Sequence, residues 1–432
     1  MNLSWPRRLA PLIASQIFLW LTLALFAFGP WQWPLRNPAQ LYLFVCGAHL
    51  ALVLGYLSAA HKAPAEHKRH FDPNTLVRWS LWITLIALPF TSFARTGSWI
   101  PDLIGGLKDP GAAYTKAQIF TENSANFAAY LRILAAPVLV MLFPLGFYFG
   151  ARLNWPTKIL MFVAMLVVII MSIATGQRRD MADLIVTVPF VVVAAHFAKV
   201  SVLSRRAILV VSVGAAASLL VFTGYFTYSH VSRVGQQAAA YGVNPVTRQS
   251  PDTDNAILNA FPSDMQPGVV ALLNYLTTGY YGLGLALERP VQPMYGAGHS
   301  MFLTRQAERL TNTAGFESRS LAVQISDKDG FKYPVFWCTA YPYFANDLGF
   351  IGTILMLFFV GRGLAQTWID MLGGKSPFAV VFFCLLMTLV FYLPATNRML
   401  QDGEGVVAFY SWLLLWSGTR LVRRKTPALV CA

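Results

Sequence analysis

The chain has 432 residues, of which 56% are hydrophobic and only 12% are charged, and its mean hydropathy is +0.52. A soluble globular chain is about 25% charged, so this composition excludes an ordinary water-soluble enzyme. The net charge of +14 comes from 33 Lys and Arg residues against 19 Asp and Glu residues. In a membrane protein such an excess is explained by loop residues that set topology, so we expect no nucleic-acid partner.

The apolar residues form blocks long enough to cross a hydrocarbon layer about 30 Å thick. Charges or Pro, Gly and Asn residues bound each block, as is typical of helix ends. The sequence therefore predicts one all-α integral membrane domain over residues 1–432. The ten predicted transmembrane helices lie at about 10–28, 40–60, 79–94, 128–150, 158–175, 181–198, 207–227, 343–363, 377–394 and 405–421.

Basic residues are distributed unevenly among the predicted connections. If the N-terminus is cytoplasmic, Lys and Arg residues gather in short cytoplasmic loops, whereas the others fall mainly in long external segments that the positive-inside rule discounts. We therefore expect both termini in the cytoplasm. The longest external segment is then 228–342, between spans seven and eight. Within it, the apolar stretch 267–288 is predicted as a membrane-surface helix, with a re-entrant or spanning helix as alternatives.

Two adjacent arginines, Arg178 and Arg179, stand at the external boundary between the fifth and sixth spans. Arginines on the translocated side run against the positive-inside bias. The guanidinium fork matches phosphate oxygens, and the start of a helix favours anions. One interpretation is therefore a diphosphate clamp. The alternative is an interfacial pair whose side chains are tied to Asp180 and Asp183.

The long external segment carries further candidates. A predicted amphipathic helix from Met301 to Leu310 places Arg305 and Arg309 one turn apart, where they can hold two oxygens of one diphosphate or form a solvated stripe. His299 precedes this helix, and histidine suits the role of general base on a sugar hydroxyl. A lone loop histidine is otherwise incidental. Further basic groups on the same side are Arg233 and Arg398.

Asp347 enters the eighth predicted span at its external end. A carboxylate inside a membrane segment is costly unless it is paired, so it is a functional candidate by default. The structural alternative is a salt bridge to one of the external arginines. Nearby Gly349 and Gly352 are predicted to allow close helix packing.

Several common chemistries lack their sequence signatures. The cysteines show no CxxC spacing, no His, Cys or Asp cluster has metal-ligand spacing, and no Walker motif is present. The first external loop, residues 29–40, has no acidic residue to act as a base and metal ligand. We therefore expect neither a metal site nor a cofactor.

In its layout and in two motifs, the chain resembles the O-antigen polymerase family, the Wzy-type polymerases of oligosaccharide repeat units. The first motif is a small residue followed by Gly-x-Arg at an external helix start, here residues 175–178. The second lies in the span after the large loop and comprises Thr339, Pro342, Asp347, Gly349 and Gly352. The chain departs from the family pattern at Arg179, where a small residue is common, and at Leu348, where Phe is common.

The resemblance implies a metal-independent, multi-span glycosyltransferase of the bacterial inner membrane whose active site faces the periplasm. It would polymerise oligosaccharide repeat units linked to undecaprenyl diphosphate into O-antigen or a related surface polysaccharide. Arg178, His299 and Asp347 are then the catalytic candidates, and the external arginines would stabilise the lipid diphosphate. The implied partners are the lipid-linked donor and acceptor glycans, membrane lipid and a separate chain-length regulator protein.

Two other functions remain open at this point. An O-antigen ligase-like enzyme uses the same donor with a lipid A core as acceptor, and it also combines external arginines with a loop histidine, which His299 matches. A lipid-linked glycan transporter is the third candidate. Transporters usually place ionisable groups inside the membrane, whereas here these groups gather at the external edge.

Overall fold

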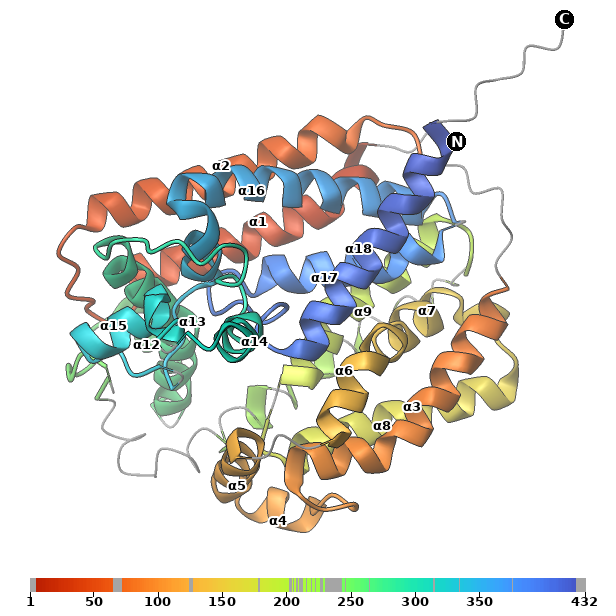
Figure 1. Cartoon of the computed structure of the whole chain (residues 1–432), viewed down its shortest axis with the longest axis horizontal. Coiled ribbons are helices and arrows are strands. Elements are labelled where there is room, and N and C mark those ends of the chain that lie inside the picture. The colour runs from red at the N-terminus through yellow and green to blue at the C-terminus, as the bar shows by residue number, and fades with distance from the viewer. Residues whose placement is uncertain are drawn as a thin grey trace, which may run out of the picture.

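The computed structural model describes residues 5–64, 72–123, 127–177, 179–201, 243–244, 246–263, 265–313, 315–333, 335–374 and 376–424, with isolated residues between 204 and 229. Within these ranges every regular element is an α-helix or a short 3-10 helix, and none is a strand (Figure 1). The predicted all-helical class is therefore confirmed for this part of the chain.

Among the described residues, seven helical segments are long and apolar enough to cross a membrane, and they match predicted spans one to six and eight. They are α1 (Trp5–Phe28), α2 (Pro38–Ala60), α3 (Pro73–Thr96), α6 with α7 (Phe127–Leu139 and Leu142–Tyr148), α8 (Trp155–Ala174), α9 (Arg179–Phe197) and α16 (Ala340–Leu372). Their length and composition support a membrane-embedded protein. The total of ten spans stays a prediction.

The other three predicted spans are not among these seven. The ninth is α17 (Pro377–Phe391), whose 15 residues extend roughly 22 Å, less than the thickness of the hydrocarbon layer. Every residue from Val380 to Val390 is buried, and Figure 1 shows α17 inside the bundle, so its apolar composition reflects a core position. The tenth is α18 (Gly403–Arg424). The seventh, 207–227, lies largely outside the described residues.

Further helices lie between the candidate membrane spans. Residues 96–127 contain α4 (Leu103–Lys108) and α5 (Pro110–Asn123), and residues 228–342 contain α12 (Ala256–Asn259), α13 (Gln266–Leu287), α14 (Met301–Thr311) and α15 (Leu321–Asp329). The amphipathic helix predicted at 301–310 is confirmed as α14, whose N-cap is Ser300. The stretch predicted as a surface helix is α13. One of its faces is buried in the bundle, where the hydroxyls of Tyr280 and Thr22 lie 3.0 Å apart.

Helix α2 and the part of α16 after Gly349 lie side by side in the same direction, in extensive contact. A Cβ atom on Gly55 would lie 1.8 Å from the carbonyl oxygen of Phe358, and one on Gly361 would lie 2.1 Å from that of Leu52. Only glycine permits this approach of two backbones. The predicted topology requires spans two and eight to run in parallel, as these helices do.

The predicted packing role of Gly349 is wrong. A Cβ atom there would meet nothing within 4 Å, and the backbone has φ 68° and ψ 170°, which breaks α16 at this residue. A Cβ atom on Gly352 would meet only Leu348, in the preceding turn of the same helix. The close contacts of α16 are made further along, at Gly361, because that is where it lies against α2.

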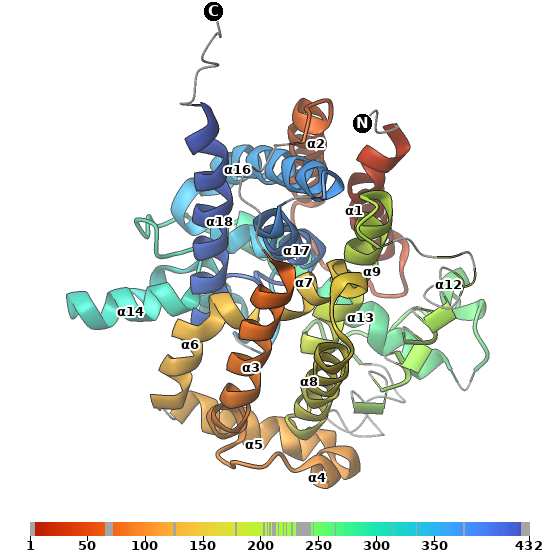
Figure 2. The same ribbon diagram turned by 90° about the vertical axis from the view of Figure 1, so that its right-hand side faces the viewer.

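The beginning of α1 and the end of α18 both contact the C-terminal end of α16 (Figure 2). The indole of Trp368 donates to the carbonyl oxygen of Arg7 at 2.8 Å, and the guanidinium of Arg420 donates to Asp370 at 2.9 Å. The two helix ends therefore lie on one side of the bundle, and their cytoplasmic location stays a prediction. Asp347 lies near the opposite end of α16, 23 residues before Asp370.

Candidate functional site

Asp347 lies two residues before the break in α16 at Gly349. The break separates a short first helix, 340–348, from the longer part of α16 that packs on α2. A left-handed backbone at this position favours glycine, because an L side chain is strained there. The first helix can thus take its own direction, and it presents Asn346 and Asp347 to the loop 294–300.

The carboxylate of Asp347 is held by four donors from that loop. Its Oδ1 accepts from the backbone N–H groups of Gly296 and Gly298, each at 2.9 Å. Its Oδ2 accepts from the backbone N–H of His299 at 2.8 Å and lies 2.9 Å from the ring nitrogen Nδ1 of the same residue. Consecutive backbone amides of this kind form a concavity that binds anions. The carboxylate therefore fixes the shape of the loop.

The imidazole of His299 lies between Asp347 and Tyr410 of α18. An ionised carboxylate only accepts hydrogen bonds, so Nδ1 carries the proton and donates to Asp347. Nε2 is then the basic nitrogen, and it lies 2.8 Å from the hydroxyl of Tyr410, which donates to it. The side chain of His299 is only 14% exposed, whereas Tyr410 is 37% exposed. The chain of hydrogen bonds thus runs from a buried carboxylate towards the surface.

Two asparagines hold the loop in place. Asn346 is buried, and its side-chain amide donates to the carbonyl oxygen of Gly298 at 3.0 Å and accepts from the N–H of Leu321 at 2.9 Å. Asn397, on the loop between α17 and α18, donates to the carbonyl oxygen of His299 at 2.5 Å. Backbone and ring of His299 are therefore fixed from three separate parts of the chain.

Close beside this loop, a cluster of arginines and carboxylates joins the ends of α3, α6, α9 and α18. Arg398 lies 3.0 Å from Asp183, 3.5 Å from Asp402 and 3.6 Å from Asp180. Burial alone would lower the pKa of Arg398, but these three carboxylates raise it above its ordinary value. Asp180 also pairs with Arg95 of α3.

The same cluster is coupled to the histidine loop through the connection 397–403. Asn397 contacts His299, the next residue is Arg398, and the N–H of Phe302 donates to the carbonyl oxygen of Gln401 at 3.3 Å. Arg132 of α6 pairs with Glu404 at 2.6 Å, at the first turn of α18. The ion pairs therefore position the start of α9 and the start of α18 relative to the histidine.

The predicted diphosphate-binding arginines lie in different surroundings. Arg305 is exposed on α14 and lies 3.3 Å from Glu317, and Arg309 is exposed on the same helix. Arg398 belongs to the ion-pair cluster. Arg178 and Arg233 lie outside the described residues, as does the side chain of Arg179, the first residue of α9. Their role in binding a diphosphate stays a prediction.

Sequence reasoning named His299 and Asp347 separately, and the structure brings them into contact. It missed Tyr410, Asn346 and Asn397, although two adjacent polar residues at the start of an apolar span were a usable signal for Asn346. Tyr410 gave no such signal, because an aromatic residue inside an apolar helix is ordinary.

No protein-family model, curated protein or solved structure matches this chain. The chemistry of the site therefore follows from its geometry. Among the described residues, no three His, Cys, Asp or Glu side chains are grouped so that they could hold a metal ion. A carboxylate that holds an imidazole in one tautomer leaves the second ring nitrogen able to accept a proton from a hydroxyl.

Proposed function

We propose that the chain is a glycosyltransferase of the bacterial inner membrane that polymerises undecaprenyl-diphosphate-linked repeat units on the periplasmic face. The observation that carries this proposal is the hydrogen-bonded chain Asp347–His299–Tyr410 at one end of an apolar helical bundle. Asp347 is a motif residue of the resemblance described above, whereas His299 is a candidate from its residue type and from its contact with Asp347. The site needs no group beyond its own side chains to take a proton from a sugar hydroxyl.

In the proposed reaction, the hydroxyl oxygen of the acceptor sugar attacks the anomeric carbon of the donor glycan. The hydroxyl proton passes to Nε2 of His299, and the bond between the anomeric carbon and the diphosphate oxygen breaks. The electron pair of that bond leaves with undecaprenyl diphosphate. Asp347 stabilises the imidazolium that forms, since its carboxylate lies 2.9 Å from Nδ1.

Tyr410 occupies the place that an acceptor hydroxyl would take beside Nε2. Because Nε2 has a single lone pair, the acceptor displaces the Tyr410 hydroxyl from it, and that hydroxyl then lies close enough to orient the acceptor. The leaving diphosphate requires positive charge, and the proposal assigns that role to Arg178 and Arg179. In support, Asp180 and Asp183 in the first turns of α9 are bound by Arg95 and Arg398, which fixes the end of α9 that carries the pair.

A second candidate is transfer of the finished glycan to a lipid A core, as in the O-antigen ligases. The observation that favours it is the histidine itself, held in an external loop by a carboxylate. Both candidates use the same donor and the same proton transfer, so they differ only in the acceptor.

The test is a gene deletion in the host bacterium, complemented at matched expression and followed by a gel of the surface polysaccharide. A polymerase predicts that the ladder collapses to a single repeat unit attached to the core. A ligase predicts that no glycan is attached and that polymer accumulates on the carrier lipid. An unchanged ladder in the deletion strain would refute both candidates.

His299→Ala should fail to restore the ladder, whereas His61→Ala should restore it. His61 is the matched control because it is an exposed histidine at the end of α2. A normal ladder with His299→Ala would refute the assignment of the general base.

A further inference from the structure

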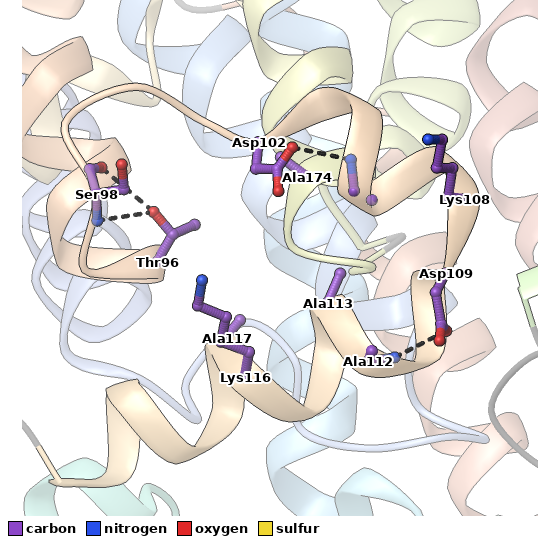
Figure 3. A pocket seen from close by; sticks show the side chains of 12 residues that line it. Thr96, Ser98, Asp102, Lys108, Asp109, Ala112, Ala113, Lys116, Ala117 and Ala174 are labelled. Atoms are coloured by element: carbon purple, nitrogen blue, oxygen red, sulfur yellow. Dashed lines mark hydrogen bonds between the residues drawn. The ribbon is translucent and has the colours of Figure 1, made fainter.

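A cavity of about 350 Å³ lies between the loop 96–102, α4, α5 and the end of α8 (Figure 3). This volume falls within the range of roughly 300–1,000 Å³ that small-molecule sites occupy. Glycines and alanines form much of the lining, and their small side chains leave this space open. At Gly106, for example, a Cβ atom would lie 2.3 Å from the carbonyl oxygen of Ile173, so α4 packs directly on the end of α8.

The polar lining of the cavity is rich in both donors and acceptors. It comprises the hydroxyls of Thr96 and Ser98, the carboxylates of Asp102 and Asp109, and the ammonium groups of Lys108 and Lys116. Figure 3 shows Lys116 reaching from α5 into the space below Thr96 and Asp102. The two lysines and two aspartates balance, so the lining is formally neutral.

The aspartates also have a structural task. Asp102 accepts from the N–H of Gly105 at 2.8 Å, and Asp109 accepts from the N–H of Ala112 at 3.0 Å, at the first turns of α4 and α5. Within the described residues, neither Lys108 nor Lys116 forms an ion pair. The ammonium groups are therefore available to a ligand, while the carboxylates are held in fixed positions.

These groups favour one chemical class of ligand. A phosphate requires an excess of cations, which a neutral lining does not supply. An acyl chain would cover four charged groups with hydrocarbon and leave the two ammonium groups without a partner. An uncharged sugar presents many hydroxyls, each able to donate and accept, and so matches hydroxyls, ammonium groups and carboxylates together.

The position of the cavity relates it to the candidate active site. Thr96 lines the cavity, and its neighbour Arg95 pairs with Asp180 in the ion-pair cluster. Ala174 also lines it and directly precedes the segment 175–178 that carries the Gly-x-Arg motif. The cavity is therefore linked to this cluster through the sequence neighbours of Thr96 and Ala174.

We propose that this cavity is a sugar subsite that holds an uncharged residue of the glycan chain away from the bond that reacts. The proposal rests on the proposed function, because it assigns a second contact to the same substrate. A subsite of this kind would keep a growing glycan on the protein between successive transfers.

The experiment measures binding of the free oligosaccharide repeat unit, released from the host polysaccharide by partial acid hydrolysis, to the full chain in nanodiscs. Ala113→Trp fills the cavity from α5 and should weaken binding by at least about tenfold, the equivalent of 1.4 kcal/mol. Lys116→Met keeps the length of the side chain but removes its donors, and it should weaken binding in the same direction. The matched control is Ile119→Trp, because Ile119 is 55% exposed on the same helix and does not line the cavity.

Saturable binding to wild type and to Ile119→Trp, with loss in Ala113→Trp and Lys116→Met, would support the subsite. The subsite would be overturned if Lys116→Met and a folded Ala113→Trp both bound the oligosaccharide with the affinity of wild type. It would also be overturned if wild type showed no saturable binding. If His299→Ala restores a normal ladder, the proposed general base fails, while the binding measurements with Ala113→Trp and Lys116→Met still decide the subsite.

Discussion

The carboxylate of Asp347 binds both the backbone and the ring of His299, with Oδ2 lying 2.8 Å from the backbone nitrogen and 2.9 Å from Nδ1. One side chain of α16 therefore sets the position and the tautomer of the histidine at once. The two residues are 48 positions apart in the sequence.

Replacing Asp347 by Asn tests this double role. The amide has nearly the same shape, but it carries no charge to stabilise an imidazolium and cannot accept with both terminal atoms. We expect the rate of glycan polymerisation to fall by roughly 10²–10⁴-fold. The measurement compares Asp347→Asn with wild type at matched amounts of folded protein, and a rate within a factor of two of wild type would contradict the role.

Tyr410→Phe tests the outer end of the chain of hydrogen bonds. The phenyl ring preserves the edge-on contact with His299, whose ring centroid lies 5.9 Å away, but the hydroxyl that binds Nε2 is lost. We expect about a tenfold lower rate, because the hydroxyl that orients the acceptor is lost, and a destabilisation of about 1 kcal/mol, because Nε2 loses its hydrogen-bond partner. Tyr130→Phe, at a tyrosine that is 43% exposed on α6, is the control and should behave as wild type.

Gly298→Ala tests how tightly the loop fits against α16. A Cβ atom would lie 2.5 Å from the Cβ of Asn346 and 3.0 Å from Oδ1 of Asp347, so the loop must shift. We expect a destabilisation of about 1–3 kcal/mol and a strong loss of activity. Thermal unfolding in detergent measures the first effect. Gly418→Ala, where a Cβ atom meets nothing within 4 Å, should leave the unfolding temperature unchanged or raise it.

Arg398→Ala tests the ion-pair cluster. Its removal leaves Asp183, Asp180 and Asp402 near one another with less positive charge between them. The side chains of Arg398 and Asp183 are 17% and 26% exposed, so the pair is partly buried, and losing charge-assisted hydrogen bonds of about 1.5–3 kcal/mol should lower the unfolding temperature. Arg309→Ala should change stability by less than about 0.5 kcal/mol, because Arg309 is exposed. Equal unfolding temperatures for the two variants would show that the cluster contributes nothing.

The length of apolar blocks was enough to locate most of the membrane helices, because the thickness of a bilayer sets their length. It was not enough to distinguish α17 from a membrane-spanning helix, since a helix buried in protein is as apolar as one buried in lipid. No apolar block of spanning length lies between the predicted spans 79–94 and 128–150. The helices α4 and α5 in that segment are short and carry little apolar periodicity, so their cavity could not be foreseen.

The candidate site, too, could be predicted only in part from the sequence. His299 and Asp347 were identified by residue type and position, but their contact depends on the break at Gly349, which the pattern of small residues predicted as a packing site instead. A glycine in an apolar helix serves either purpose, and the neighbours that decide between them come from distant parts of the chain.

The most direct test of the proposed function uses purified protein reconstituted in liposomes with undecaprenyl-diphosphate-linked repeat units and no other protein. Wild type should convert single units into a ladder of longer lipid-linked glycans, and His299→Ala should leave them single. Failure of folded wild type to join any units, or an equal ladder with His299→Ala, would contradict the proposal.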